Sequence, residues 1–265
     1  MNAPVWLLLR GLTRDRRHWG DFPDRLAAAL PPEARVVCID LPGNGALHGL
    51  RSASHVPGLV AQARAQVAAR GLAGRPVHLL AMSLGAMVAV AWAEAHPDEI
   101  AAAVLVNTSL RPFSPFWQRL RPRAWGPLLA CLWPGTSAGR WERSILDLTS
   151  RLAVCRPESP VLLRHWTAWR ASHPVSRANA LRQLRAAVAF RAPREAPPVP
   201  LLLLSGAADG LVHPACSQAL ARAWGLPIAV HPGAGHDVPL DDPAWVVAQV
   251  VAWCPGVRRS SRPPP

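Results

Sequence analysis

Short apolar runs and longer stretches with helical spacing alternate along the chain. Runs of about four to eight apolar residues that end at glycine, proline or polar turns are typical of buried strands. Such runs lie within residues 5–9, 34–43, 76–82, 100–109, 199–210 and 226–239. Helical patterns lie between or after them, at residues 22–30, 58–71, 84–96, 214–224 and 242–253. Strands that are apolar at nearly every position, with helices between them, predict a parallel sheet covered on both faces.

This alternation stops between residues 111 and 191. The segment is rich in proline, tryptophan and arginine and has no clear strand pattern. An insert of about eighty residues between two core strands is typical of a lid or cap over a site. We therefore predict an α/β core made of residues 1–110 and 192–254, a mostly helical cap of residues 111–191, and a disordered tail of residues 255–265.

Composition limits the class of protein. The chain has 265 residues, of which 50% are hydrophobic, which suits one large domain or one domain with an inserted subdomain. It lacks an apolar run of about 18 residues, so we expect no membrane span, and its apolar start is too short for a signal peptide. Five scattered cysteines without a CxxC pair predict reduced thiols rather than disulfides or a zinc site. These features favour a cytoplasmic location with no metal or organic cofactor.

The charge of the chain is concentrated in the predicted cap. The net charge is +13, and all 29 basic residues are arginine. The cap holds 14 of them against Glu142, Asp147 and Glu158, a net charge of +11, which leaves +2 for the remainder. The surplus is either an arginine-rich solvated surface or a docking face for an acidic partner. No nucleic-acid-binding motif accompanies it, so we expect no nucleic-acid partner.

A candidate nucleophile, Ser83, lies in the sequence Ala-Met-Ser-Leu-Gly between a predicted strand and a predicted helix. A serine presented at a sharp strand-to-helix turn needs small residues two positions before and after it, because the strand and helix pack closely there. Ala81 and Gly85 meet this need. The following helix directs its first amides at the turn and favours negative charge there. The alternative is that Ser83 is simply a small residue at the start of a buried helix.

A serine nucleophile needs a base and an acid that orients the base. Asp209 directly follows a strongly apolar strand, and His236 lies in a glycine-containing loop after the next strand. The order Ser, Asp, His places all three at carboxyl ends of strands. Asp237 cannot easily bend back to the ring of its own neighbour, so we predict a surface-loop role for it. Asn107 carries no charge and could not stabilise an imidazolium, which leaves Asp209 as the acid.

An oxyanion hole needs two backbone N–H groups that point at the reacting carbonyl. The residue after the nucleophile, Leu84, supplies one candidate. The loop after the first strand supplies the other at Leu12, because Gly11 lets the backbone approach the substrate closely. Arg10 precedes this glycine and is expected to form part of the wall of the site.

Five motifs together resemble the α/β-hydrolase fold family, in its capped, esterase-like form. They are Arg-Gly-Leu at 10–12, Asp-Leu-Pro-Gly-Asn-Gly at 40–45, and the segments 81–85, 206–214 and 233–239. The resemblance implies a mostly parallel sheet with helices on both faces, an inserted helical cap, and catalysis by Ser83, Asp209 and His236. It also implies that two edge strands common in the family are missing or reduced. Two departures are Ala81, where the family has glycine, and Arg10, where histidine is common.

The cap is expected to decide the substrate. Its tryptophans either pack its own small core or form an apolar wall over Ser83, and we take Trp117, Trp166 and Trp169 as pocket candidates beside Arg10 and Gly11. The predicted function is a serine hydrolase that cleaves a small-molecule carboxylic ester with a hydrophobic acyl group through an acyl-enzyme.

Two alternatives remain for the function. The protein resembles small capped esterases that act on pimeloyl-acyl-carrier-protein methyl ester, in which a basic cap meets an acidic carrier protein. It is otherwise a non-catalytic binding module for an acidic partner. Thioesters, lactones, small amides and C–C bonds also stay open as targets, because the specificity lies in the cap.

Overall fold

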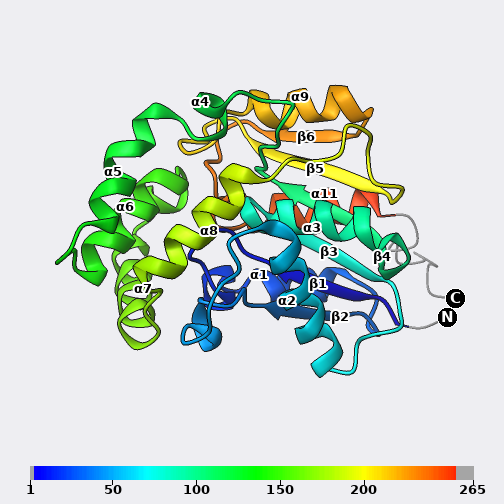
Figure 1. Ribbon diagram of the computed structural model, residues 1–265, viewed down its shortest axis with the longest axis horizontal. Helices are drawn as coiled ribbons and strands as arrows, with labels where there is room; N and C mark the ends of the chain where they lie inside the picture. The colour runs from blue at the N-terminus through cyan, green and yellow to red at the C-terminus, as the bar shows by residue number, and fades with distance from the viewer. Residues whose placement is uncertain (1–2, 255–265) are drawn as a thin grey trace, which may run out of the picture.

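The computed structural model describes residues 3–254 and contains a six-stranded sheet (Figure 1). Every pair of neighbouring strands is parallel, and the order across the sheet is β2-β1-β3-β4-β5-β6. The strands are β1 (Val5–Leu9), β2 (Arg35–Ile39), β3 (Val77–Met82), β4 (Ile100–Val106), β5 (Leu201–Gly206) and β6 (Ile228–His231). The predicted α/β class with a parallel sheet is confirmed.

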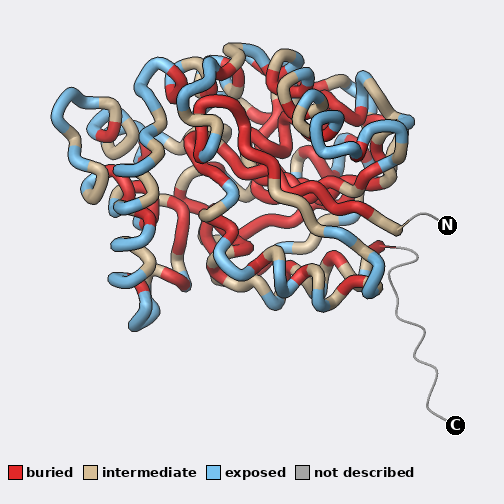
Figure 2. The backbone as a smooth tube through the Cα atoms, turned by 90° about the horizontal axis from the view of Figure 1, so that it is seen from below, coloured by how far each residue is buried: buried red, intermediate tan, exposed pale blue. Residues whose placement is uncertain are grey.

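Side chains of each strand alternate between two apolar layers. In β1, Leu7 and Leu9 join the cluster on one face, and Trp6 and Leu8 join the cluster on the other. This arrangement buries the inner strands β1, β3, β4 and β5 on both sides, which is why their sequences are apolar at nearly every position (Figure 2). The edge strands β2 and β6 are partly exposed. One face is covered by α2 (Val56–Ala69), α3 (Leu84–Ala95) and α9 (Ala215–Trp224), the other by α1 (Phe22–Ala29) and α11 (Pro243–Trp253).

Helix α2 begins two residues earlier than its sequence pattern predicts. The ring of His55 accepts a hydrogen bond of 3.0 Å from the N–H of Gly58, so it caps the helix in the way a shorter polar side chain usually does. Pro57 is tolerated because the first helical turn needs no internal N–H donor. Shorter helical segments are η1 (Arg16–Trp19), η2 (Gly45–Leu47), η3 (Pro97–Glu99) and α10 (Val238–Asp241).

The chain between β4 and β5 is helical and lies beside the carboxyl ends of the strands (Figure 1), and we refer to residues 111–191 as the cap. Its elements are α4 (Phe116–Arg119), α5 (Pro122–Leu132), α6 (Ala138–Thr149), η4 (Ala153–Cys155), α7 (Ser159–Ser172) and α8 (Arg177–Ala189). Arg111 and Arg191 pair as an isolated parallel bridge, and the N–H of Ala192 donates to the carbonyl of Arg111 at 2.8 Å. The cap therefore leaves and rejoins the core at one stem.

A buried carboxylate fastens the cap to the loop after β6. Asp241 is fully buried, and its oxygens accept backbone N–H groups from the cap and from Gly235 of the core loop, at 2.7 Å for Gly235. The cap donors are the backbone N–H groups of Arg151, Leu152 and Ala153. A carboxylate held by several amides on both sides fixes the two segments relative to each other.

A second fastening lies between the loop after β1 and helices α6 and α7. Glu142 is buried and forms ion pairs with Arg14 of the core and Arg170 of the cap. Burial alone would raise the pKa of Glu142, but the two guanidinium groups outweigh burial and hold that pKa below its usual range. The guanidinium of Arg14 also stacks 4.2 Å from the ring centre of Trp166.

Two further sequence expectations concern membranes and the tail. Among the helices of residues 3–254, none combines the length and apolarity that crossing a bilayer would require. The predicted disordered tail, residues 255–265, lies outside the described residues.

Candidate active site

Ser83 lies at a sharp turn between β3 and α3. Its φ is +54° and its ψ is −119°, a conformation that non-glycine residues rarely adopt. The turn is held by the N–H of Ser83, which donates to the Val106 carbonyl of β4 at 3.0 Å, and by the Ser83 carbonyl, which accepts from Ala86 at 3.0 Å. The side chain is only partly buried and lines a cavity. The sequence-predicted elbow is thus present as a strained strand-to-helix turn.

Small residues permit this turn, as the sequence pattern suggests. A Cβ added to Gly85 would lie 2.6 Å from the Leu9 carbonyl oxygen and 2.7 Å from that of Arg10, so only glycine fits there. Ala81 is fully buried in the apolar layer between the sheet and α3, and this layer accommodates its methyl group. A Cβ on Gly11 would meet the Cβ of Ser83 at 3.0 Å, which places the loop after β1 directly against the serine.

His236 and Asp209 are joined by a hydrogen bond of 2.7 Å between Nδ1 of the ring and Oδ2 of the carboxylate. Both side chains are almost fully buried. The other carboxylate oxygen of Asp209 accepts the backbone N–H groups of Leu211 at 2.7 Å and Val212 at 2.9 Å. These bonds fix the carboxylate and orient the ring. They leave Nε2, the opposite ring nitrogen, available to bond with other groups. His236 lines the same cavity as Ser83, although no hydrogen bond joins the two side chains.

Asn107 holds the histidine loop in place. It follows β4 with a φ of +46°, and its amide nitrogen donates to the carbonyls of Gly235 at 3.1 Å and His236 at 2.7 Å. Its amide oxygen accepts the N–H of Gly206 at the end of β5. An amide can donate and accept at once, whereas a carboxylate could only accept. Asn107 is therefore not the acid, as expected from its lack of charge, but a clamp that no sequence pattern predicts.

Asp237 does not lie in a surface loop, and that prediction is wrong. The side chain is 2% exposed, and its two oxygens accept hydrogen bonds from the guanidinium of Arg10, one of them 3.0 Å long. Burial alone would raise the pKa of Asp237, but the Arg10 charge outweighs burial and lowers that pKa. The arginine that replaces the common histidine therefore has a buried partner in the residue next to His236. Only tertiary structure brings the two together, so no local pattern reveals the pair.

The two predicted oxyanion donors belong to loops that meet at Ser83. Leu84 begins α3, and Leu12 follows Gly11 in the loop packed against the serine. Within residues 3–254, neither amide donates a hydrogen bond to another protein atom. Both residues line the cavity beside Ser83. Free backbone N–H groups beside the serine can donate hydrogen bonds to an oxygen atom that develops a negative charge.

The cavity has a volume of about 320 Å³ and lies between the strand ends and the cap. Arg10 and Gly11 line it, as predicted, together with Trp125, which was not among the candidates. Most of the remaining lining is apolar, and part of it comes from the cap, for example Leu120, Leu128, Ile145, Leu184 and Val188. The cavity is therefore suited to an apolar group that ends near Ser83.

Three tryptophans predicted to line this pocket lie elsewhere. Trp166 is fully buried beneath the Arg14 guanidinium, and Trp169 packs edge-on against His18 at a ring-centre distance of 5.5 Å. Trp117 is 51% exposed on the outer side of α4. The sequence alone could not tell which environment each residue has, because a tryptophan in a cap helix can be buried, packed edge-on or exposed.

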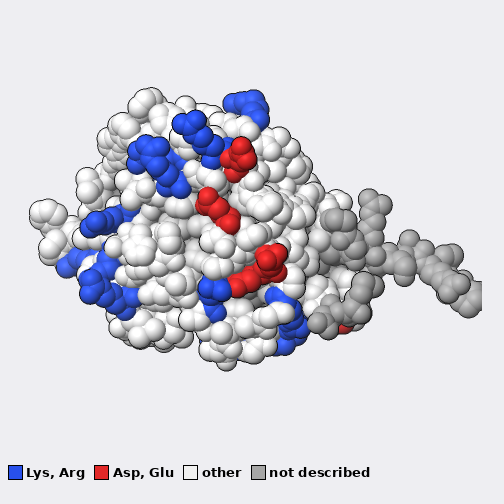
Figure 3. Space-filling view, turned by 45° about the vertical axis from the view of Figure 1, so that its right-hand side comes forward, with Lys and Arg blue, Asp and Glu red and all other residues white. Residues whose placement is uncertain are grey.

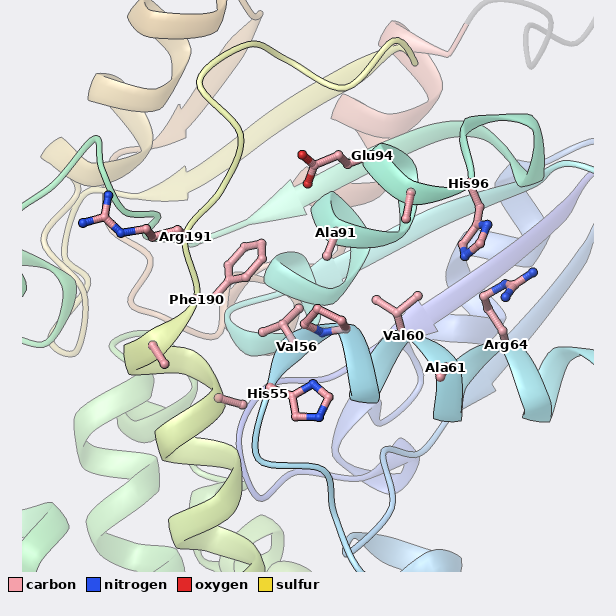
Figure 4. A pocket seen from close by; sticks show the side chains of 14 residues that line it. His55, Val56, Val60, Ala61, Arg64, Ala91, Glu94, His96, Phe190 and Arg191 are labelled. Atoms are coloured by element: carbon pink, nitrogen blue, oxygen red, sulfur yellow. The ribbon is translucent and has the colours of Figure 1, made fainter.

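A larger hollow of about 440 Å³ lies between α2, α3 and α8 but holds none of the candidate residues (Figure 4). Its floor is apolar, with Val60 and Phe190 among its lining side chains. Two of its polar side chains already serve the fold: the ring of His55 caps α2, and Arg64 forms an ion pair with Glu99 outside the hollow. The candidate residues Ser83 and His236 line the smaller cavity instead. Within the described residues, no group of three His, Cys, Asp or Glu side chains is arranged to hold a metal ion.

Comparison with known proteins gives relatives of several named activities. Monoacylglycerol lipase abhd6-B of Xenopus laevis is 29% identical over 106 residues, which is 40% of this chain and 30% of that protein. Biotin biosynthesis bifunctional protein BioHC of Teredinibacter turnerae is 32% identical over 108 residues, 41% of this chain and 18% of that protein. The chain thus spans less than a third of the length of each of these two curated relatives.

A solved structure extends the likeness over nearly the whole chain. The thermophilic esterase from Thermogutta terrifontis is 23% identical, and the match covers 95% of this chain and 89% of that one with a TM-score of 0.73. At this identity the likeness shows the fold. The model of the alpha/beta hydrolase family matches residues 6–249, a range that includes β1 through most of α11 and the cap between them. The chain belongs to the alpha/beta hydrolase family.

Proposed function

We propose that the protein is a serine hydrolase that cleaves a carboxylic ester with a hydrophobic acyl group. The observation that carries the proposal is the buried 2.7 Å hydrogen bond that joins Asp209 to His236, whose ring lines the same cavity as Ser83. A histidine oriented by a fixed carboxylate beside a strained serine is the arrangement that activates a hydroxyl group. The apolar lining of the cavity supports a hydrophobic acyl group over a charged one.

The proposed reaction proceeds through an acyl-enzyme. The Ser83 hydroxyl attacks the ester carbonyl while His236 takes its proton, and Asp209 stabilises the imidazolium that forms. The backbone N–H groups of Leu12 and Leu84 bind the oxyanion. His236 then returns the proton to the leaving alcohol, and water repeats the sequence to release the acid. The Ser83–His236 hydrogen bond forms when substrate is bound, since such bonds are often long in unliganded sites.

Labelling with a fluorophosphonate probe tests this proposal. The probe modifies an activated serine, so the wild-type protein should be labelled and Ser83→Ala should not. Equal labelling of both proteins, or no labelling of a folded wild type, would contradict the assignment. A series of p-nitrophenyl esters of increasing acyl length then tests the cavity, and kcat/KM should rise with chain length until the cavity is filled.

A second candidate is an esterase for a methyl ester linked to an acidic carrier protein. The net charge of +11 on the cap favours it, because an acidic protein would be steered toward such a surface. The relative named for biotin biosynthesis gives it further support. If reversing several cap arginine charges at low salt left cleavage of a carrier-linked ester unchanged, this candidate would be excluded.

A further inference from the structure

The cap has an apolar face that no part of residues 3–254 covers. On α5, Trp125, Leu129 and the adjoining Trp133 are spaced four residues apart and so lie along one side of the helix. Leu129 is 67% exposed and Trp133 is 72% exposed. The opposite side of α5 buries Ala124 and Cys131. The helix is therefore apolar on two sides, and only one of them has a protein partner.

A second exposed apolar stripe, on α8, extends this face. Leu181 and Val188 are each more than half exposed, with Arg177 and Arg185 spaced along the same side of the helix. The guanidinium of Arg177 donates to the Trp133 carbonyl at 3.3 Å, which ties the start of α8 to the end of α5. We call the exposed residues of α4, α5 and α8 the cap face: Phe116, Trp117, Trp125, Leu129, Trp133, Leu181 and Val188.

The cap face borders the Ser83 cavity, and we call this border the cavity mouth. Phe116, Trp125 and Val188 are exposed to solvent and also line the cavity. The rings of Phe116 and Trp125 are stacked with their centres 6.2 Å apart. An apolar chain lying on the cap face could therefore enter the cavity without crossing a polar surface.

The charge of the cap indicates what covers this face. Within the described residues, Glu142 is the one acid of the cap that forms an ion pair, and its partners are Arg14 and Arg170. Arg177 and Arg185 form no ion pair with any described carboxylate. Basic side chains lie at the left, the top and the lower part of the face seen in Figure 3, with acidic ones nearer the centre. Two copies of the chain meeting through this face would bring like charges together, whereas an anionic surface would complement them.

Aromatic side chains favour a lipid surface over an acidic protein. Tryptophan beside arginine on an exposed helix is typical of proteins that lie in the boundary between lipid headgroups and acyl chains. Helix α5 has 11 residues, about 16 Å of length, so it could lie along a bilayer but not cross one. We propose that the cap face binds a membrane surface that contains anionic phospholipid, with Arg177 and Arg185 at the phosphates and the cavity mouth toward the bilayer.

This arrangement names a substrate class for the proposed hydrolase: acyl esters that reside in a membrane, which reach Ser83 through the mouth in the cap face. The substrate class rests on the proposed function, whereas the binding of the cap face to a membrane does not. The full-length protein and Ser83→Ala should therefore bind membranes equally well.

Co-sedimentation with vesicles tests the binding. Both proteins should sediment with vesicles of phosphatidylcholine and phosphatidylglycerol at least about tenfold more tightly than with phosphatidylcholine alone, and added salt should weaken the binding. Leu129→Ser combined with Trp133→Ser should lower the affinity about tenfold or more, since two anchoring side chains are lost. The matched control is Leu50→Ser with Val230→Ser, two exposed apolar residues outside the cap, which should bind like wild type.

Two charge-reversal variants test how much the lipid headgroups contribute to membrane binding. Arg177→Glu with Arg185→Glu should remove the preference for anionic vesicles, while Arg35→Glu with Arg70→Glu, an equal charge change on exposed core residues, should leave most of it. The soluble substrate p-nitrophenyl acetate should be cleaved equally by wild type and by the Leu129/Trp133 variant, because neither residue lines the cavity.

Several outcomes would overturn the proposal. Wild type that does not sediment with anionic vesicles, or cap-face variants that bind like their controls, would exclude a membrane partner. A dimer in solution that the Leu129/Trp133 variant converts to monomer would show that a second copy covers the face instead. If the proteins bind vesicles but the probe does not label wild type, the proposed function fails while the membrane surface stands.

Discussion

The backbone N–H of Thr13 donates a 2.8 Å hydrogen bond to Oε1 of Gln183, and this bond joins the loop after β1 to helix α8 of the cap. Gln183 is fully buried, and its amide nitrogen donates to Oδ1 of Asn44 at 2.9 Å. Thr13 has a φ of +58° and directly follows Leu12, a proposed oxyanion donor. A cap residue therefore holds a strained peptide next to the amide on which catalysis would depend.

We predict that Gln183→Leu lowers kcat by up to about a hundredfold, because a small displacement of the Leu12 amide weakens oxyanion binding. KM for a p-nitrophenyl ester should change little. Asn179→Leu is the matched control, since Asn179 is a buried amide one turn earlier on α8 that bonds to Leu50 and Ser52 instead. Both variants should lose stability in urea unfolding. Equal loss of kcat in both would mean that Gln183 is purely structural.

Replacing the orienting acid should affect rate far more than folding. Asp209→Asn keeps the size of the side chain but removes the charge that stabilises the imidazolium and can hold the ring in the wrong tautomer. We expect kcat to fall by about a thousandfold or more with a nearly unchanged Tm. Asp147→Asn, on the exposed side of α6, should leave kcat unchanged. A small effect of Asp209→Asn would remove Asp209 from the proposed triad.

Gly85→Ala should disrupt the serine turn. Its new Cβ would press on the carbonyl oxygens of Leu9 and Arg10, which are backbone atoms and cannot move aside cheaply. We expect a lower Tm and loss of fluorophosphonate labelling. Gly126→Ala makes the same change in α5 where nothing lies within 4 Å, and it should stabilise the protein by about 0.5–1 kcal/mol. Retained labelling in Gly85→Ala would show that the turn has more room than its geometry indicates.

Stability should fall as the pH drops from 6.5 toward 4 because of His18. Burial, and then the nearby Arg14 charge, lower the pKa of His18 from 6.5 to about 4, against the opposing effect of Asp15 and Glu142. In this window the unfolded chain binds a proton that the folded chain does not, so the free energy of unfolding decreases by up to about 3 kcal/mol.

A variant isolates the contribution of that histidine. His18→Asn can still accept the N–H of Asp15, which now bonds to the ring at 3.2 Å, but it does not titrate. Urea unfolding at a series of pH values should show a flatter slope between pH 6.5 and 4 for this variant. His165→Asn, an exposed position on α7, should keep the wild-type slope. Identical slopes in all three proteins would assign the acid sensitivity to other groups.

Breaking the buried pair of Arg10 and Asp237 should destabilise the fold. Arg10→Met leaves a buried carboxylate without a partner, and we expect a loss of about 3–5 kcal/mol at pH 7. Because the pKa of Asp237 is lower in the folded protein than in the unfolded chain, the pair contributes its full stabilisation above the pKa of the unfolded chain. This stabilisation is lost as the pH falls through the pKa of Asp237 in the folded protein.

The double variant Arg10→Met with Asp237→Leu should recover most of that stability, since no unpaired charge remains. Arg25→Met removes an exposed ion pair with Asp21 and should leave the unfolding midpoint unchanged. A double variant as unstable as Arg10→Met would mean that the pair contributes through packing rather than through charge.

The core of this fold could be predicted from sequence because the four inner strands, β1, β3, β4 and β5, are buried on both faces. An apolar run such as 201–206 has few alternatives when turn residues bound it and helices flank it. Ser83, Asp209 and His236 could be chosen for the same reason, since parallel strands bring their carboxyl ends to one edge. The local pattern also contained the signal for the turn, in Ala81 and Gly85.

Contacts between distant segments could not be predicted. Asp237 has an ordinary loop sequence, and only the fold shows that Arg10 reaches it from 227 positions away. Asn107 clamps the histidine loop through an amide that sequence analysis considered only as a failed acid. The cap tryptophans differ in environment because each helix has its own orientation, which an arginine- and proline-rich sequence does not encode locally.

The stem at Arg111 and Arg191 bears on how such proteins diversify. Because the two ends of the cap lie side by side, the sheet needs only a short bridge there, whatever length of chain departs and returns. Insertions, deletions or wholesale exchange between these two points leave β4 and β5 in register. A chimaera spliced at these positions would keep the sheet, but its new segment would also have to replace the bond of Gln183 to Thr13 and the amides that Asp241 accepts.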